Sequence, residues 1–342
     1  MDNGCTGCRN SMTQKHQGLK NHSNHTCTCK DHGEKIKIDP GLEQTAAGTD
    51  IKNRSGAMDS RTDDRQTSDD LKSKIIQDIK DLPPMPQVVI KIQHLISNLN
   101  SDTKQLAEVI ESDQSIAAKV LKMANSAFYG MSGKISSIHQ ASLLLGYRTL
   151  GEIVTMAGAS HLLSGKMPGY GYDPQELWKH SLSVAFASKM IAEMKKSSLI
   201  YEAHTAGLIH DVGKIILDRY ILENKRDIED YMSREEKTFL DAERNFFGFD
   251  HAGIASEICR SWHIPETITL AIMCHHRPSA SNGDELSYIL HLADYVATMG
   301  GIGYDDDDIL YEAEKGAMDF VGLSQEEVGN MMPKVLEAVE QF

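Results

Sequence analysis

The sequence predicts an all-α fold, a multi-helix bundle with a helical N-terminal subdomain and a disordered N-terminal tail. From about Leu71 onward, apolar residues recur at helical spacing between short breaks of Gly, Pro, Ser or Asp. Alternating strand patterns are almost absent, and no internal repeat stands out. Apolar stripes of this period are what a bundle of packed helices requires.

The apolar stripes place a series of helices along the chain. Pro83, Pro84 and Pro86 open a helix through Val88 and Ile92, because proline suits the first turn. Two further helices are expected up to about residue 130. Later helices are expected at 138–163, 174–195, 199–219, 233–247, 251–263, 265–276, 284–299 and 324–340.

Residues 1–70 differ in composition from the rest of the chain. They contain no Phe, Trp or Tyr, so they cannot bury enough apolar surface to offset the entropy cost of ordering. Four cysteines lie there, Cys5, Cys8, Cys27 and Cys29, among several histidines. These side chains could bind zinc, but their spacing is irregular and nothing apolar would pack around the ion. A flexible tail that binds metal adventitiously or not at all is the simpler interpretation.

The charge and hydropathy of the chain exclude some classes of function. The formal net charge is −14, and the first 70 residues hold ten Lys/Arg and eleven Asp/Glu, so almost all of the excess is in the body. An acidic body repels a nucleic-acid backbone, so we expect no direct nucleic-acid binding. No stretch reaches the length of a membrane helix, and no secretory signal opens the chain. We therefore expect a cytoplasmic protein.

Ionisable residues occupy positions on several helices where the period requires an apolar side chain. They are His180, His251, His275 and Asp294, and they accompany the pair His210-Asp211. A single histidine of this kind is usually a core residue bonded to backbone. Burying so many polar groups without partners is costly, however, so we expect them to satisfy one another or a metal ion. Imidazole and carboxylate ligands suit iron, manganese, zinc or nickel.

This series resembles the ligand series of HD-domain phosphohydrolases, including the HD-GYP phosphodiesterases. The resemblance implies one or two divalent ions held by residues of five segments: His180, His210, Asp211, His251, His275, His276 and Asp294. It also implies catalytic roles for Asp211, which would bridge the metals, and for Lys214, which would contact a substrate phosphate. Lys214 could instead cap a helix or pair with Asp211, three residues before it.

The region before the His-Asp pair narrows the resemblance to the HDOD family. The motifs that are similar are Leu82-Pro83-Pro84-Met85-Pro86, Asn125-Ser126 on the helix Lys119–Phe128, Asp250-His251-Ala252-Gly253-Ile254-Ala255 and Trp262-His263-Ile264-Pro265. They span about residues 78–300. This likeness implies an HD-like bundle divided into a tail at 1–70, an N-terminal helical half at 71–165, an HD-like half at 166–300 and a helical extension at 301–342.

Two functions remain open at this point. The first is a bacterial signalling module that binds a regulatory protein partner, with or without a metal centre and a nucleotide ligand. The second is a metal-dependent phosphohydrolase acting on a phosphodiester or nucleotide. Arg277-Pro278 follows the histidine pair, and the Asp-Gly-x-Gly-Tyr-Pro run of HD-GYP enzymes is missing. This departure argues against cyclic-di-GMP phosphodiesterase activity.

Overall fold

The computed structural model describes residues 71, 73–82, 84–97, 103–131, 133–195, 197–301 and 313–342. The predicted tail at 1–70, with its Cys/His cluster, lies outside them. In the described part the regular secondary structure is helical, and the nearest thing to a strand is an isolated antiparallel bridge between Met167 and Tyr172. The all-α prediction is confirmed. No helix in these ranges combines the length and apolarity needed to cross a bilayer.

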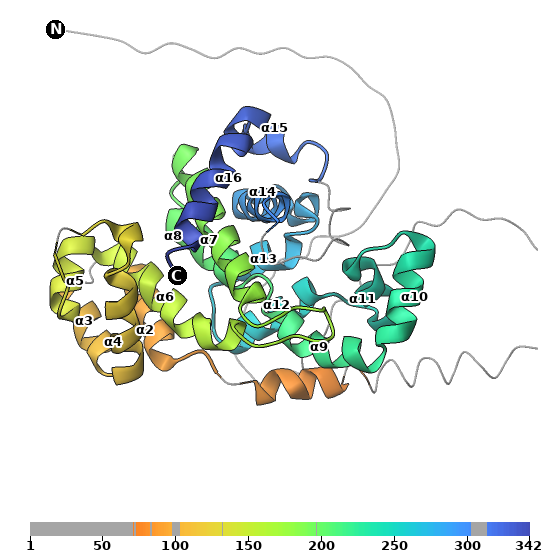
Figure 1. Cartoon of the computed structure of the whole chain (residues 1–342), viewed down its shortest axis with the longest axis horizontal. Coiled ribbons are helices and arrows are strands. Elements are labelled where there is room, and N and C mark those ends of the chain that lie inside the picture. The colour runs from red at the N-terminus through yellow and green to blue at the C-terminus, as the bar shows by residue number, and fades with distance from the viewer. Residues whose placement is uncertain are drawn as a thin grey trace, which may run out of the picture. The chain divides into compact units, whose positions relative to one another are not determined.

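The first helices pack around α6, as Figure 1 shows. Helical residues 73–81 precede α2 (Gln87–Ser97), α3 (Thr103–Glu111), α4 (Gln114–Ala124), α5 (Ile138–Leu145) and α6 (Tyr147–Leu163). Each contributes an apolar stripe, with Val89, Ile92, Leu106, Val120 and Ile153 fully buried. Burial of these stripes stabilises helices that are too short to persist alone in water.

Among the remaining helices, α7 (Glu176–Met194) contacts α8, α14 and α16. The others are α8 (Ile200–Ile209), α9 (Gly213–Glu223), α10 (Lys225–Glu235), α11 (Phe239–Phe247), α12 (His251–Ser261), α13 (Glu266–Cys274), α14 (Glu285–Met299), α15 (Ala317–Val321) and α16 (Gln325–Val339). Almost every side chain of α7 from Leu177 to Ser188 is buried. The described residues form one compact unit, and the predicted division at 165 and 300 stays a prediction.

Three of the expected helices are in fact pairs of helices. The expected helix 138–163 divides at Gly146, whose φ of +78° no continuing helix can adopt. The expected helix 199–219 divides at residues 210–212, where Val212 N donates to Ile209 O in a tight turn. The expected helix 233–247 is replaced by α10 and α11, which are separated at Thr238 by a capping box.

Candidate metal centre

Asp211 is the point on which four buried histidines converge. It lies in the turn between α8 and α9 and is itself almost fully buried. Its carboxylate oxygens are 3.3 Å from His251 Nε2, 3.4 Å from His210 Nε2, 3.6 Å from His180 Nε2 and 3.9 Å from His275 Nε2. The break between α8 and α9, which the periodicity did not indicate, thus places the carboxylate at the centre of the cluster.

The other two predicted ligands lie on opposite sides of this group. Asp294 Oδ1, on α14, is 3.2 Å from His180 Nε2 and 3.6 Å from His210 Nε2. His276 Nε2 is 2.7 Å from His251 Nε2. The structure therefore brings all seven residues of the predicted ligand series together, and they divide into one group around His180 and another around His251.

Two glycines permit the helix contacts that assemble the group. A Cβ on Gly207, in α8, would lie 2.7 Å from Ala185 Cα of α7. A Cβ on Gly213, at the start of α9, would lie 2.1 Å from His251 O of α12. Atoms cannot approach so closely, so only glycine allows these backbones to touch. The first contact joins the helices of His180 and His210, and the second brings Asp211 next to His251.

Hydrogen bonds fix which ring nitrogen of three histidines faces inward. His210 Nδ1 bonds Gly207 O at 2.9 Å, and His275 Nδ1 bonds Ile272 O at 2.6 Å. His251 Nδ1 bonds the Glu243 carboxylate at 2.8 Å. Carbonyl and carboxylate oxygens only accept, so Nδ1 must carry the hydrogen in each case. In the neutral ring the Nε2 lone pair then points toward Asp211, as metal binding requires.

These inward nitrogens make a poor set of partners for one another. His180 Nε2 and His210 Nε2 face each other at 3.3 Å. His275 Nε2 is buried and makes no hydrogen bond to any described residue. Lone pairs gathered beside two carboxylates need protons or a cation between them. The donor set therefore fits a divalent ion, and three overlapping triads could hold one: His180–His210–Asp211, His210–His275–Asp294 and His251–His275–His276.

The electrostatics favour ionised carboxylates and neutral rings at His180, His275 and His276. The neighbouring carboxylates raise the pKa of His210 and His251 despite the burial of both rings. Burial alone would raise the pKa of Asp211, but the nearby His210, Lys214 and His251 outweigh it and hold that pKa well below its usual range. The pKa of Asp294 is likewise lowered, through its hydrogen bonds to His180 and His210. Burial lowers the pKa of His275 to about 3. Ionised carboxylates and unprotonated imidazoles are the forms that bind metal ions.

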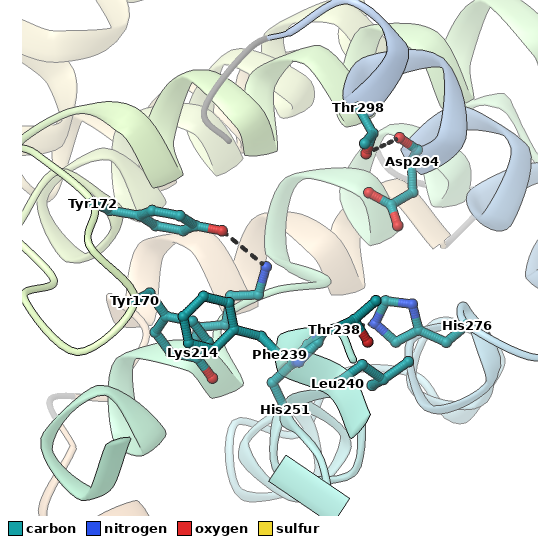
Figure 2. Close-up of a pocket in the computed structure, with 10 residues that line it drawn as sticks. All are labelled: Tyr170, Tyr172, Lys214, Thr238, Phe239, Leu240, His251, His276, Asp294 and Thr298. Atoms are coloured by element: carbon teal, nitrogen blue, oxygen red, sulfur yellow. Dashed lines mark hydrogen bonds between the residues drawn. The ribbon is translucent and has the colours of Figure 1, made fainter. Parts of the chain in front are cut away.

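Lys214 lies beside the cluster and lines a cavity that opens next to it (Figure 2). Its Nζ is 2.9 Å from Asp211 Oδ2 and 3.5 Å from the Tyr172 hydroxyl, and it also lies near the faces of the Tyr170 and Tyr172 rings. The pairing with Asp211 is thus present. The cavity of about 50 Å³ is lined by Tyr170, Tyr172, Lys214, Thr238, Phe239, Leu240, His251, His276, Asp294 and Thr298. A small polar group in this cavity would lie beside both the Asp294 carboxylate and the Lys214 ammonium.

Sequence reasoning missed Glu243 and Tyr170. Glu243 is completely buried on α11 and holds His251, while the Tyr170 hydroxyl donates to Glu243 Oε1 at 2.7 Å. A signal for Glu243 was present, since it lies between Phe239 and Phe247 on the apolar stripe of its helix, just as the ligand histidines do. Tyr170 belongs to an irregular segment between α6 and α7, where no period applies.

Not every buried histidine belongs to the cluster. His291, one turn before Asp294, bonds His275 O through Nδ1 at 2.7 Å and accepts from Glu314 N through Nε2 at 2.7 Å. It therefore ties the segment around Glu314 to α13 and α14. His204 on α8 is fully buried near Phe186, on the part of α8 that precedes the Gly207 contact.

Residues 82–278 match the family model of the HDOD domain. This match covers more than half of the chain. The chain belongs to the HDOD family. The motif at Leu82–Pro86 and the histidines from His180 to His276 lie within the match, whereas Asp294 lies beyond its end. The predicted family is confirmed.

Solved structures share the fold. An HDOD domain protein of unknown function from Geobacter sulfurreducens superposes with a TM-score of 0.69 at 24% identity, covering 81% of this chain and 97% of that one. A candidate signal transduction protein from Marinobacter aquaeolei gives 0.64 at 23% identity, covering 81% and 64%. A candidate phosphohydrolase from Shewanella amazonensis gives 0.61 at 20% identity, covering 78% and 97%. At these identities the likeness shows the fold alone.

A curated relative extends beyond this HDOD chain. It is an uncharacterized protein of Treponema pallidum (strain Nichols), 23% identical over 209 residues, which are 60% of this chain and 40% of the relative. This chain thus matches less than half of that relative's length.

Proposed function

We propose that this HDOD protein binds one or two divalent metal ions at the Asp211 cluster and hydrolyses a phosphate ester there, as part of a bacterial regulatory pathway. The convergence of inward Nε2 atoms on Asp211 carries the proposal, because three of those rings are held by Nδ1 bonds that leave a lone pair on Nε2. Histidines that served packing alone would have no need of a common target. Iron, manganese, zinc and nickel all suit such ligands.

The residues in and around the cluster would have separate roles in the proposed hydrolysis. Asp211 would help to hold the metal, since His210 Nε2 and His251 Nε2 both lie near its Oδ1, at 3.4 Å and 3.3 Å. A divalent ion bound there would lower the pKa of a coordinated water and polarise a phosphoryl oxygen. Lys214 Nζ, at the cavity wall, would bind the phosphate and move away from Asp211 to do so. The aromatic walls at Tyr170 and Phe239 would exclude bulk water from the reaction.

A second candidate function is regulation by binding a protein partner without turnover. One observation favours it: the buried Glu152 of α6 bonds Lys189 of α7 at 2.6 Å. This pair connects the N-terminal helices to the helix that carries His180. A partner bound to the N-terminal helices would therefore act on α7, and the solved relative named as a candidate signal transduction protein has the same fold.

Metal content separates the two functions. Protein purified without chelator is analysed for iron, manganese, zinc and nickel, and then assayed on phosphomonoester, phosphodiester and nucleotide substrates with added metal. We expect one to two equivalents of metal, lost in Asp211→Ala and kept in His204→Gln, a buried histidine outside the cluster. A metal-free protein with no hydrolysis under supplementation would exclude the phosphohydrolase and leave the binding module.

The N-terminal cysteines need their own control, since zinc bound there would confuse the metal count. In the full-length chain, Cys5, Cys8, Cys27 and Cys29 are replaced together by serine. Unchanged metal content assigns the ions to the Asp211 cluster. Loss of the metal in this variant, with retention in Asp211→Ala, would place the metal in the tail and contradict the proposal.

A further inference from the structure

Glu243 makes an unusual set of contacts for a carboxylate with no exposed surface. Its Oε2 accepts from His251 N at 2.7 Å, and both oxygens lie within 2.9 Å of His251 Nδ1. Its Oε1 also accepts from the Tyr170 hydroxyl at 2.7 Å. All of these partners are donors, so the carboxylate is satisfied only while it is ionised and while His251 presents Nδ1–H to it.

This contact fixes both the orientation and the tautomer of His251. Because Nδ1 donates to Glu243, the lone pair of the neutral ring is on Nε2, which lies 3.3 Å from Asp211 Oδ1 and 2.7 Å from His276 Nε2. A carboxylate behind an imidazole also makes the ring a stronger metal ligand. Glu243 thereby increases the negative charge that the cluster offers to a cation, without contacting the cation itself.

Glu243 is in turn held by the segment between α6 and α7. The backbone N–H groups of Gly169 and Tyr170 donate to Asp218 Oδ1 at 2.8 Å and 3.2 Å, which anchors Tyr170 to α9. Burial, together with the charge of Glu243, raises the pKa of Tyr170 well above its usual value, so its hydroxyl stays protonated and donates. The carboxylate of Glu243 is thus placed by contacts from two separate elements.

The Nδ1 atoms of His210 and His275 have a different kind of partner from the Nδ1 atom of His251. His210 and His275 turn their Nδ1 atoms to neutral backbone carbonyls, at Gly207 and Ile272. An uncharged acceptor fixes the ring but adds no negative charge. The two groups of ligands are therefore electrostatically unequal, and the group around His251 depends on a residue that lies outside it.

We infer that Glu243 is a positioning residue for the metal subsite of His251, His275 and His276, and that its loss weakens that subsite while sparing the one at His180, His210 and Asp294. The inference rests on the proposed metal centre. It adds a residue that acts only through His251, and it predicts that the two subsites separate in affinity.

Metal titration of the full-length protein tests this inference. Manganese and zinc are each titrated into metal-free protein, and binding is followed by calorimetry. Wild type is expected to bind two equivalents. In Glu243→Ala, one equivalent should bind about 10- to 100-fold more weakly, as is usual for the loss of such a supporting group, and the other should be unchanged. In Glu243→Gln the side chain can still accept a hydrogen bond from His251 but has no charge, so the loss of metal affinity should be smaller than in Glu243→Ala.

A matched variant separates this role from the general cost of losing a buried carboxylate. Glu152→Gln removes another buried carboxylate, which is paired with Lys189 and has no contact with the cluster among the described residues. Circular dichroism and thermal melting verify that each variant is folded. Folded Glu243→Ala that binds both equivalents with wild-type affinity, or Glu152→Gln that weakens the same equivalent, would overturn the inference.

Failure of the proposed function would show separately. If wild type binds none of manganese, zinc, iron and nickel, the metal centre itself is wrong. Nitrogen-15 NMR of histidine-labelled, metal-free protein then still tests the positioning role. His251 should be protonated at Nδ1 in wild type and a mixture of tautomers in Glu243→Ala. A wild-type ring protonated at Nε2 and not at Nδ1 would contradict the role of Glu243 whatever the metal content.

Discussion

His180 Nε2 lies 3.3 Å from His210 Nε2, across the contact of two helices that pack directly on each other. Two neutral imidazoles that point lone pairs at each other repel, and a shared proton or a cation removes the repulsion. In a metal-loaded protein the ion serves that purpose. The folded state then depends on the ion, because the unfolded chain has no assembled site to bind it.

Removal of the metal should therefore lower the thermal stability. At a free metal concentration 100 times the dissociation constant, binding contributes about 2.7 kcal/mol to the free energy of unfolding. Melting followed by circular dichroism, with and without EDTA, measures the effect. His180→Ala should melt at a lower temperature and respond less to EDTA. An equal response to EDTA in that variant would place the stabilising ion elsewhere.

Gly207→Ala should separate α7 from α8 and disturb the cluster between them. The added Cβ would lie 2.7 Å from both Ala185 Cα and Val184 O, which are backbone atoms that cannot move aside cheaply. Overpacking of this kind costs about 1–3 kcal/mol or more. Urea denaturation should show this loss together with weaker metal binding.

Gly329→Ala is the matched control for that substitution. Gly329 lies inside α16, and nothing is within 4 Å of its added Cβ. Alanine favours a helix over glycine by about 1 kcal/mol, so this variant should be as stable as wild type or more so. Equal destabilisation by the two substitutions would show that close contact at Gly207 is not the cause.

His204 should make the stability of the protein sensitive to acid. Burial, and to a smaller extent Lys189, lowers the pKa of His204 to about 3, against about 6.5 in an unfolded chain. Between these values the unfolded state binds the extra proton, so stability rises with pH, is fully present above 6.5 and is lost as pH falls toward 3. From pH 7 to pH 5 the loss from this group is about 2 kcal/mol.

His204→Leu should remove that contribution. Urea denaturation of both proteins at pH 7 and pH 5, in EDTA to exclude metal release, gives the difference between the two slopes. His161, which is exposed on α6, provides the control His161→Leu, with an unchanged pH dependence. A wild-type slope in His204→Leu would mean that His204 titrates normally in the folded protein.

Lys214→Met should reduce hydrolysis of the substrate without reducing metal binding. The Lys214 ammonium is at the cavity wall beside Tyr172, so its loss should remove phosphate contacts and reduce kcat/KM by about 10²-fold, while the metal ligands remain. The readouts are metal content and hydrolysis of the substrate found for wild type. Loss of metal from this variant would show instead that Lys214 serves to hold Asp211 in place.

All seven residues of the proposed ligand set could be predicted from the sequence, but not how the fold brings them together. His180 and Asp294 could be predicted because each interrupts an apolar stripe, and a stripe is a local property that periodicity can detect. The helix break at His210-Asp211 was missed, since the residues that form the turn are individually compatible with a helix. The turn lies next to the close approach of Gly213 to His251 O, a tertiary contact that periodicity cannot detect.

Glu243 shows a different limit of sequence reasoning. It lies on the stripe of α11 as plainly as the histidines lie on theirs, yet no nearby motif suggested a partner for it. Its hydrogen-bond partners are Tyr170, more than 70 positions away in the sequence, and His251, the first residue of α12. Periodicity could place it in the interior, whereas only coordinates could say what it meets there.

Helix α11 begins at the cavity and ends beyond the carboxylate that steadies His251. Thr238 and Leu240 line the cavity, and Glu243 follows about one turn later on the same helix. A molecule that displaces Leu240 is therefore expected to displace Glu243 as well, and with it the ring of His251. If the proposed metal site is correct, widening the cavity for a larger ligand would consequently weaken the binding of the ion, and a bound ligand would alter it in the same way.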